Sequence, residues 1–483
     1  MTRILFSNNM ILQSSDIKIK KGLDLPLEGA AERRCTDGRG ATRYAVKPTD
    51  YVGLVPRLLV SEGDRVQRGD ALFCDKNDAR IRFTSPCDGR VCGVVRGERR
   101  QLQAVVVEKT QESPRLFPTD DMDVKEAMLR TGLWTMLRQR PFGTVANPDS
   151  SPKAVVVSCF DSAPLAPDYD YMLQGREADF CRGLEALAAA GGCPVHVGFR
   201  RQGRLQTVVE QWAHAAPCEV GLHVVEGPHP AGNVGTLIAR VCPIDKGDVV
   251  WTMGPQEVAM LGLLVRTGEY RPEKYVAVAG PQTADPHYYR VLSGVSVASL
   301  TAGQVPHAHY PRLDDEERYP SRYVSGNVLS GTQVEADGFL GGYDSLLTIL
   351  PEGAYYDFMG WLLPGVRKHS FSRTFVSGFL PACGGRLPFA LPEALKPQFD
   401  TNLHGGVRPL VFTGNFERVF PFDIYPLQLL KACIVGDMEL QENLGIYEVE
   451  PEDFALCEYI DISKTDIQPI IREALEKLRK EGV

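Results

Sequence analysis

Residues 58–95 read LLVSEGDRVQRGDALFCDKNDARIRFTSPCDGRVCGVV, and this stretch decides the fold of the first part of the chain. Short apolar runs alternate here with three turns, Glu62-Gly63-Asp64, Arg68-Gly69-Asp70 and Asp88-Gly89. Glycine beside aspartate is typical of tight turns, and the short runs between the turns are typical of strands. The same pattern extends over residues 41–112, so we expect a compact module of short β-strands there.

The order of the turns resembles the barrel-sandwich fold of lipoyl and biotinyl carrier domains. The resemblance rests on Gly63-Asp64, Gly69-Asp70, Ser85-Pro86 and Gly89. In those carriers a lysine at the tip of a hairpin holds the cofactor, and Lys76 is the local candidate. Lys76 stands too far from Ser85-Pro86 for this role and lacks the usual flanking residues, so we expect a solvated turn lysine in a structural β module. A modified carrier lysine is the alternative.

The composition excludes several classes of protein. The chain has 483 residues and a net charge of −8, and its 43% hydrophobic and 24% charged residues are typical of a globular protein. The 46 glycines and 34 prolines favour many turns. The acidic balance argues against a nucleic-acid-binding protein, and also against docking on anionic lipid through a polybasic patch.

The sequence also predicts neither a membrane span nor a metal cluster. Apolar stretches of ~18 residues or more, which a membrane-spanning helix needs, do not occur. The first 16 residues lack a long apolar core and a small-residue cleavage site, so we expect no signal peptide. The 12 cysteines stand singly, without a CxxC pair, and Cys87 and Cys92 are the closest two. We therefore expect reduced thiols in a cytoplasmic protein.

Residues 113–272 alternate between strand and helix patterns. The β-branched run at 154–158 predicts a buried parallel strand, and residues 194–197 and 221–225 predict two more strands. Between them, residues 179–190 have helical periodicity and end at Gly191-Gly192. This alternation predicts an α/β domain with a parallel sheet.

The last two parts of the chain have different patterns. Residues 273–355 return to strand patterns at 275–280, 295–300 and 343–350, whereas residues 356–483 are mixed. Apolar side chains at positions 467, 470, 471, 474, 475 and 478 predict a final amphipathic helix, capped by Thr465 or Asp466 and packed on its own domain. We therefore expect a multidomain protein of the α/β and α+β classes.

The loop at residues 227–238 is the most suggestive place for a cofactor. It follows a predicted strand and precedes a predicted helix, where glycines let the backbone approach a phosphate and the helix N-terminus attracts negative charge. Gly232, Asn233 and Gly235 are the candidate residues. Their spacing departs from GxGxxG, and the acidic residue of that fingerprint is missing. A structural tight turn is the favoured interpretation, and a nucleotide site is the alternative.

The remaining patterns are weaker evidence for a metal or catalytic site. His307 and His309 could share one face of a strand and bind a metal with His287, but no cysteine or acidic partner stands at ligand spacing. We therefore expect no metal site, and the acidic run at 314–317 is expected to be a solvated loop. The motifs GxSxG and HExxH and the P-loop do not occur. The residues alone predict a multidomain scaffold rather than a self-sufficient enzyme.

Ordered blocks of the sequence resemble the A subunits of the bacterial sodium-translocating NADH:quinone oxidoreductases. The blocks are residues 17–26, 229–238, 250–251, 256–258, 350–353, 361–365, 415–419 and 429–432, then Asp437, Glu439, Gly445 and Glu448, and finally residues 452–457. The resemblance runs from residue 16 to the C-terminus. Residues 1–15 lie outside it and are expected to form an N-terminal extension.

This resemblance implies a fold and the absence of a redox cofactor. It implies a barrel-sandwich hybrid at 16–112, a Rossmann-like α/β domain at 113–272, a ubiquitin-like β-grasp (SLBB-type) domain at 273–355 and a mixed, helical C-terminal domain at 356–483. Relatives such as the NADH-binding subunit of respiratory complex I and the C subunit of the Rnf complex hold flavin in an acidic, Gly-rich loop and iron–sulfur clusters in CxxCxxC groups. Here the loop at 232–235 lacks the acidic residue, and Cys383, Cys433 and Cys457 lie far apart. Gly232, Asn233 and Gly235 are then vestiges of a cofactor loop.

The function that the resemblance implies is that of a peripheral, cofactor-free component of a larger complex. The complex has six subunits, oxidises NADH, reduces ubiquinone or menaquinone and pumps Na⁺ out of the cytoplasm. The other five subunits carry FAD, FMN, riboflavin and iron–sulfur centres, and the flavin-bearing B subunit in the membrane is the chief expected partner. We expect the chain on the cytoplasmic face of the bacterial inner membrane, with neither a catalytic residue nor a metal of its own. The alternatives are a flavin- or nucleotide-binding oxidoreductase that uses loop 227–238, and an isolated quinone-binding subunit.

Overall fold

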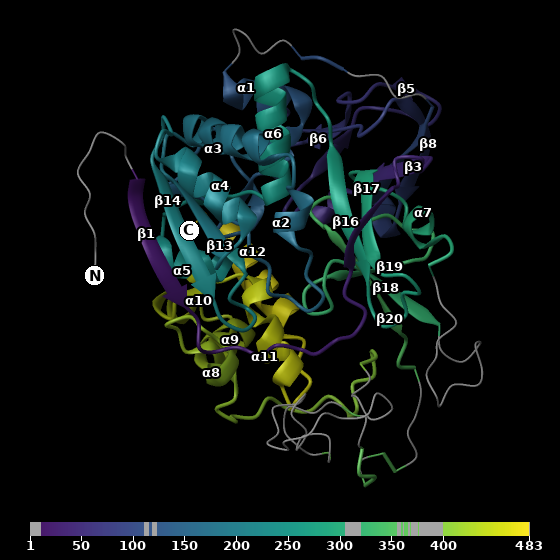
Figure 1. Cartoon of the computed structure of the whole chain (residues 1–483). Helices are drawn as coiled ribbons and strands as arrows, with labels where there is room; N and C mark the ends of the chain where they lie inside the picture. The colour runs from purple at the N-terminus through teal and green to yellow at the C-terminus, as the bar shows by residue number, and fades with distance from the viewer. Residues whose placement is uncertain are drawn as a thin grey trace.

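The computed structural model describes residues 11–110, 115–117, 123–304, 320–354, 359–360, 362–365, 368, 375 and 399–482. Figure 1 shows the chain from its N-terminus in purple to its C-terminus in yellow. In these ranges the strands form four sheets of seven, six, four and three strands. None of the helices described has the length and apolar character that a membrane crossing requires.

The segment at 58–95 belongs to two small sheets that pack against each other. Their strands are β3 (Arg43–Val46), β4 (Pro56–Leu58), β5 (Arg65–Val66), β6 (Ala71–Asp75), β7 (Arg82–Thr84), β8 (Gly89–Arg96) and β9 (Leu102–Lys109), in the orders β3-β9-β8-β5 and β4-β6-β7. Gly63 and Gly69 make the predicted turns with φ of +95° and +81°. Phe73, Phe83 and Val105 are among the alternate, inward-facing residues that fill the space between the sheets. The predicted β module is confirmed.

A seven-stranded sheet forms the centre of the α/β domain. Its order is β1-β14-β13-β12-β15-β10-β11, with β1 (Ile11–Lys18), β14 (Val220–Glu226), β13 (Val195–Arg200), β12 (Ala154–Ser158), β15 (Val250–Thr252), β10 (Arg138–Arg140) and β11 (Thr144–Val145). The five strands from β1 to β15 run parallel, and β10 and β11 continue the sheet in antiparallel pairs. The predicted strands at 154–158, 194–197 and 221–225 are confirmed as β12, β13 and β14.

Both faces of this sheet are covered, which explains the unbroken apolar run of β12. Val155 and Val157 pack with α3 (Glu177–Gly191) and α6 (Pro255–Thr267), the helices of one face. Val156, between them, packs on the other face with α5 (Val234–Val241). Three further elements complete the helices up to this point, α1 (Val124–Thr131), α2 (Tyr169–Met172) and α4 (Arg204–Ala213). Short 3-10 turns are η1 (Pro48–Asp50), η2 (Glu98–Arg100) and η3 (Leu133–Met136).

The C-terminal helices share the core of the α5 face. They are α8 (Phe416–Val419), α9 (Pro426–Val435), α10 (Met438–Asn443), α11 (Ala455–Ile460) and α12 (Ile467–Lys480), with the 3-10 turns η8 (Ile446–Glu448) and η9 (Pro451–Phe454). Phe454, Ile471 and Leu475 belong to the same buried cluster as Val156 of β12. The predicted final helix is confirmed as α12, and Asp466 holds its N-cap position without a side-chain hydrogen bond. The helix thus packs beyond its own region, onto the central sheet.

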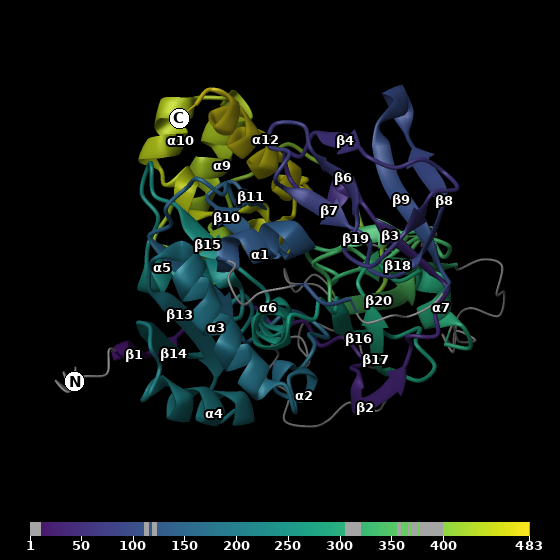
Figure 2. The same cartoon turned by 90° about the horizontal axis from the view of Figure 1, so that it is seen from above.

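The remaining strands form a six-stranded sheet in the order β19-β18-β20-β16-β17-β2. Its strands are β19 (Thr332–Val334), β18 (Ser321–Ser325), β20 (Leu346–Pro351), β16 (Glu273–Ala279), β17 (His287–Leu292) and β2 (Glu32–Asp37). Figure 2 shows this sheet and the seven-stranded sheet on opposite sides of α6. The strands expected at 275–280 and 343–350 correspond to β16 and β20.

The expected strand at 295–300 is wrong, because this segment forms the short helix α7 (Val297–Thr301). Ser296 stands at the N-cap position, and its Oγ lies 2.6 Å from Ser299 Oγ. Thr301 Oγ1 also donates to Val297 O at 3.0 Å, a bond made across one helical turn. No side-chain bond caps this helix, and its first residues are held by other parts of the chain: Ser296 N–H donates to Arg43 O at 3.2 Å and Val297 N–H to Gly338 O at 2.9 Å.

The start of the chain contributes to two sheets outside the barrel sandwich. β1 crosses the expected division at residue 16 and pairs with β14, whereas β2 pairs with β17 in the six-stranded sheet. Both are parallel pairings with strands far along the sequence, and no local pattern indicates such partners. Residues 11–37 therefore link the two larger sheets before the barrel sandwich begins at β3.

Candidate functional site

The loop between β14 and α5 lies where the sequence predicts it. β14 ends at Glu226 and α5 begins at Val234, so the loop joins the carboxyl end of a parallel strand to a helix N-terminus. Nucleotides bind at such places in α/β proteins, because the helix N-terminus attracts phosphate. The groups that surround Gly232, Asn233 and Gly235 therefore decide whether a nucleotide fits.

Gly232 packs against the chain itself. Its N–H donates to Ser162 Oγ at 2.8 Å, and its carbonyl oxygen accepts from Ser158 Oγ at 3.0 Å. A Cβ at this position would overlap the backbone nitrogen of Ser162. The glycine is required for this internal contact and does not leave a surface for a ligand.

The first turn of α5 is covered by Asp453 from the C-terminal region. A Cβ on Gly235 would lie 2.6 Å from Asp453 Oδ1 and 2.7 Å from Oδ2, so the carboxyl group sits against this turn. Asn233 holds the N-cap position of α5 but makes no side-chain capping bond. A carboxylate near a helix N-terminus is stabilised by the helix dipole, as a phosphate is. The Asp453 carboxyl group therefore lies beside the first turn of α5, where a phosphate bound at this helix N-terminus would meet it.

The N-terminal segment also packs on the loop. The backbone N–H of His229 donates to Asp24 Oδ1 at 2.8 Å, and the N–H of Leu23 donates to His229 O at 2.9 Å. His229 is 3% exposed, and its Nδ1 lies 3.1 Å from Ser162 Oγ. Burial lowers the pKa of His229 to about 4, so its ring is neutral at pH 7.

Arg140 is the centre of a buried ionic cluster that holds Asp453 in place. Its Nε lies 3.0 Å from Glu450 Oε1, its Nη2 lies 2.6 Å from Glu452 Oε1, and its Nη1 lies 3.5 Å from Asp453 Oδ2. Burial opposes the charge of Arg140, but the three carboxyl groups raise its pKa above the usual value. Because Arg140 ends β10 and the acidic residues belong to η9 and its cap, the cluster fastens the C-terminal region to the central sheet.

The carboxyl groups of the cluster differ in protonation. Burial raises the pKa of Asp453 to about 7, although Arg140 acts in the opposite direction. Burial also opposes the ionisation of Glu452, but Arg140 lies closer to this residue and lowers its pKa. Asp453 is therefore the group whose charge changes near neutral pH.

We expect Asp453→Asn to change how the free energy of unfolding depends on pH. The folded-state pKa of Asp453 is raised from 3.8 to about 7, so the folded protein holds this proton more tightly than the unfolded chain. The stability that this proton contributes is present below pH 4 and is lost as the pH rises to 7. The stability of Asp453→Asn relative to the natural protein should therefore rise by about 1–3 kcal/mol between pH 4 and pH 7. Urea unfolding at a series of pH values measures this difference.

Asp149→Asn is the matched control. The hydrogen bond from the Arg80 side chain lowers the pKa of Asp149 below its usual 3.8, so this group does not titrate between pH 5 and 7. The stability difference for Asp149→Asn should stay constant over that range. A constant difference for Asp453→Asn as well would show that Asp453 is ionised throughout, contrary to the expectation.

Lys76 lies at the tip of the hairpin between β6 and β7, and its side chain is exposed. Its backbone N–H donates to Val55 O at 2.8 Å. In the same hairpin Arg80 forms ion pairs with Asp78 at 2.7 Å and with Asp149 of the α/β domain at 2.6 Å. These contacts hold the tip against the rest of the chain and support a turn lysine, which stays a prediction.

The expected metal candidates are only partly described. His307, His309, Cys383 and residues 314–317 lie outside the described residues. His287 is buried, with Nε2 3.0 Å from Thr36 Oγ1 and Nδ1 2.7 Å from Asp285 O, so both ring nitrogens have hydrogen-bond partners. Within the part of the chain that the structure describes, no group of three or more His, Cys, Asp or Glu residues could hold a metal ion.

The described cysteines form no disulfide. Eleven cysteines are free, and Cys433 and Cys457 of the C-terminal helices are buried. Burial raises the pKa of Cys433 to about 12 and that of Cys457 well above its usual value. Both thiols are therefore protonated at neutral pH.

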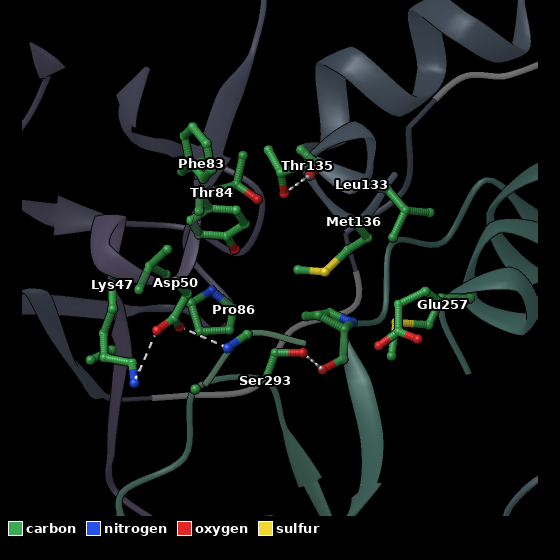
Figure 3. Close-up of a pocket in the computed structure, with 18 of the residues that line it drawn as sticks. Lys47, Asp50, Phe83, Thr84, Pro86, Leu133, Thr135, Met136, Glu257 and Ser293 are labelled. Carbon is green, nitrogen blue, oxygen red and sulfur yellow. Dashed lines mark hydrogen bonds and ion pairs between the residues drawn. The ribbon is translucent and has the colours of Figure 1, made fainter. Parts of the chain in front are cut away.

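A small cavity lies where the barrel sandwich, the α/β domain and the six-stranded sheet meet (Figure 3). Figure 3 shows Thr84 from the barrel sandwich, Thr135 and Glu257 from the α/β domain, and Ser293 from beyond β17. The volume is about 40 Å³. Because a buried water needs roughly 10–15 Å³ of such space, the cavity has room for a few waters and not for a flavin or quinone ring.

The sequence does not predict that the residues packed around the candidate loop contact it. Asp24 and Asp453 belong to blocks that carry the resemblance, but Arg140 and Ser162 lie outside these blocks. The available signal was the set of acidic residues around Pro451, between the apolar Val449 and Phe454. Charge between apolar residues indicates a buried ionic contact, but the partner, Arg140, lies too far along the chain to be named from a local pattern.

Comparison with known proteins agrees with this architecture. The model described as the NqrA N-terminal barrel-sandwich hybrid domain matches residues 17–110, the NqrA second alpha/beta domain matches residues 119–270, and the NQRA C-terminal domain matches residues 275–336. The crystal structure of an NAD⁺-reducing [NiFe]-hydrogenase in the H₂-reduced state aligns over 42% of this chain and 41% of its own, with 15% identity and a TM-score of 0.30. A likeness of this size supports no conclusion.

Whole-length relatives match as well. Over 476 residues the chain is 36% identical to the A subunit of the Na(+)-translocating NADH-quinone reductase of Yersinia pseudotuberculosis serotype O:1b (strain IP 31758), covering 96% of this chain and 100% of the relative. Proteins of the same name match with 37% identity over 478 residues in Serratia proteamaculans (strain 568) and 36% over 479 residues in Pseudomonas aeruginosa (strain UCBPP-PA14), with the same coverage. The expected fold class, with its barrel-sandwich, α/β and SLBB-type domains, is confirmed. The chain therefore belongs to the NqrA family, the A subunits of the Na(+)-translocating NADH-quinone reductases.

Proposed function

We propose that the chain is the peripheral A subunit of a Na⁺-translocating NADH-quinone reductase and that it acts through assembly, not through a redox group of its own. Catalysis then belongs to the complex, in which the partner subunits carry FAD, FMN, riboflavin and iron–sulfur centres. The covering of α5 by Asp453 supports the absence of a nucleotide in this chain. The chief partner is the flavin-bearing B subunit in the membrane, at the cytoplasmic face of the bacterial inner membrane.

An exposed apolar surface on the C-terminal region carries this proposal. It consists of Val407, Val411, Phe412, Ile434 and Val435, which are 49% to 80% exposed, and we name it the C-terminal apolar surface. Large apolar side chains that gather on one surface are typical of protein–protein interfaces.

Side-chain contacts fasten the loop of Val411 and Phe412 to its neighbours. Lys431 Nζ lies 5.8 Å from the centre of the Phe412 ring, so the loop before α8 packs on α9. Ile434 and Val435 follow Lys431 by one turn of α9 and share its side of the helix. The backbone N–H of Val411 donates to Ser463 Oγ at 3.2 Å, which holds the loop to the segment before α12. These contacts join the loop of Val411 and Phe412 to α9 and to the segment before α12, and such preorganisation lowers the cost of binding.

We expect the double variant Phe412→Glu/Val435→Glu to separate the chain from its partners. Two carboxylates in an apolar interface would be desolvated without partners, so recovery of the other subunits with the tagged chain should fall roughly tenfold or more. The measurement is purification of the tagged chain from detergent-solubilised membranes, with the subunits identified by mass spectrometry. Once separated from its partners, the natural chain should show no flavin absorbance.

Val55→Glu/Leu59→Glu is the control, because it adds the same two charges at exposed apolar residues of the barrel sandwich. The control should recover the partners as the natural chain does. Full recovery of the partners by Phe412→Glu/Val435→Glu would place the docking surface elsewhere. A yellow, flavin-bearing isolated chain would instead favour the oxidoreductase alternative.

A further inference from the structure

The charges of this acidic chain are unevenly distributed. Residues 41–110 contain 13 Lys and Arg and 9 Asp and Glu, a net +4, so the other residues carry a net −12. The net charge of −8 therefore hides a basic part of the molecule, the barrel sandwich. Net charge alone does not exclude an electrostatic contact made by one surface.

The basic residues gather at the tip of the β8–β9 hairpin. Figure 2 shows this hairpin protruding beyond the rest of the barrel sandwich. The tip holds Arg96, Arg99 and Arg100, all exposed, beside Glu98 and the 44% exposed Val95. Arg99 and Arg100 have left-handed backbone conformations, with φ of +52° and +62°. Such a convex tip offers no enclosed pocket for a small molecule.

In the described residues, no ion pair joins these tip arginines to a carboxylate of the chain. Elsewhere, Arg182, Arg204 and Arg266 pair with acidic residues of α3. At the tip, the only side-chain bond of these arginines in the described residues joins Arg96 Nη1 to the carbonyl oxygen of Arg100 at 3.2 Å. Their guanidinium groups are therefore available to an external anion, and the planar guanidinium suits phosphate.

We propose that the tip of the β8–β9 hairpin binds the headgroups of anionic phospholipids. The tip and α9 both lie toward the upper edge of Figure 2, whereas Figure 1 shows β8 and α9 at opposite ends of the molecule. The inference rests on the proposed function, since a peripheral subunit docked on a membrane subunit lies beside the lipid surface. Exposed arginines next to an exposed valine fit a phospholipid surface, where the cations meet phosphate and the apolar group meets acyl chains.

The test is sedimentation of the isolated full chain with vesicles. The chain should bind vesicles that contain phosphatidylglycerol in low salt, and should not bind vesicles of phosphatidylcholine alone. Binding should weaken at high salt. Arg96→Gln/Arg99→Gln/Arg100→Gln should reduce the partition coefficient roughly 100-fold, because each arginine near an anionic surface contributes about a fivefold gain.

The control is Arg182→Gln/Arg204→Gln/Arg266→Gln, which makes the same change in net charge at α3, α4 and α6. It should bind phosphatidylglycerol vesicles as the natural chain does. The proposal is overturned if the tip variant still binds, if the control loses binding equally, or if phosphatidylcholine vesicles bind as well. Displacement by polyglutamate with no binding to any vesicle would also overturn it and indicate an acidic protein partner. None of these outcomes depends on the co-purification experiment, so the two proposals fail separately.

Discussion

Arg140→Met is expected to lower the free energy of unfolding by about 3–5 kcal/mol, since it removes the cation from a cluster of three carboxyl groups. The Arg140 side chain is 4% exposed, Glu450 also 4% and Asp453 0%, so water cannot replace the lost partner. Methionine keeps an unbranched apolar chain in place of the aliphatic part of arginine, so the loss of stability comes mainly from the missing charge. Urea unfolding followed by tryptophan fluorescence at pH 7 measures the change.

The same substitution at Arg80 tests whether burial is the cause. Arg80 also lies between two carboxylates, those of Asp78 and Asp149, but its side chain is 49% exposed. Exposed ion pairs contribute little, so Arg80→Met should cost less than about 1 kcal/mol. Equal losses at the two sites would mean that the buried cluster does not hold the C-terminal region. Arg140→Met/Glu450→Leu should recover part of the stability, because it also removes a carboxylate that lost its partner.

Elements with a strong internal pattern could be predicted from the sequence. β12 was predicted because three consecutive valines suit a strand buried on both faces, and α12 because its apolar side chains repeat with the helical period. α7 was missed because its short segment alternates apolar and polar residues as a strand does. β1 and β2 have mostly polar sequences and pair through backbone bonds with distant strands. Their place in the fold depends on partners that no local pattern reveals.

The strand, loop and helix around the candidate residues could be predicted from the sequence, but the groups that surround them could not. The strand, loop and helix around Gly232 and Gly235 follow from local rules. What fills the space beside them comes from Asp453, more than two hundred residues further on. A glycine that admits a phosphate and a glycine that admits another part of the same chain give the same sequence signal. Only the packing of η9 on α5 in the folded chain distinguishes these two kinds of glycine.

A close helix contact gives the second large expected effect. Gly183 of α3 and Gly262 of α6 lie where the two helices cross beneath the central sheet. A Cβ on Gly262 would overlap the carbonyl oxygen of Asp179 and lie 2.7 Å from the backbone nitrogen of Gly183. A Cβ on Gly183 would likewise overlap the carbonyl oxygen of Val258. Backbone atoms surround both positions, so a side chain fits only if the helices move apart.

Gly262→Leu is therefore expected to lower the free energy of unfolding by about 3 kcal/mol or more, and Gly262→Ala by about 1–3 kcal/mol. Helix propensity alone predicts that Gly262→Ala raises the free energy of unfolding, because alanine in a helix is favoured over glycine by about 1 kcal/mol. Gly406→Ala is the control: nothing lies within 4 Å of a Cβ there, so the change should be neutral or slightly stabilising. Urea unfolding of the three variants shows whether the steric clash or the helix propensity dominates at Gly262. A stabilised Gly262→Ala would show that α3 and α6 separate at little cost, and that the glycines are not what sets their distance.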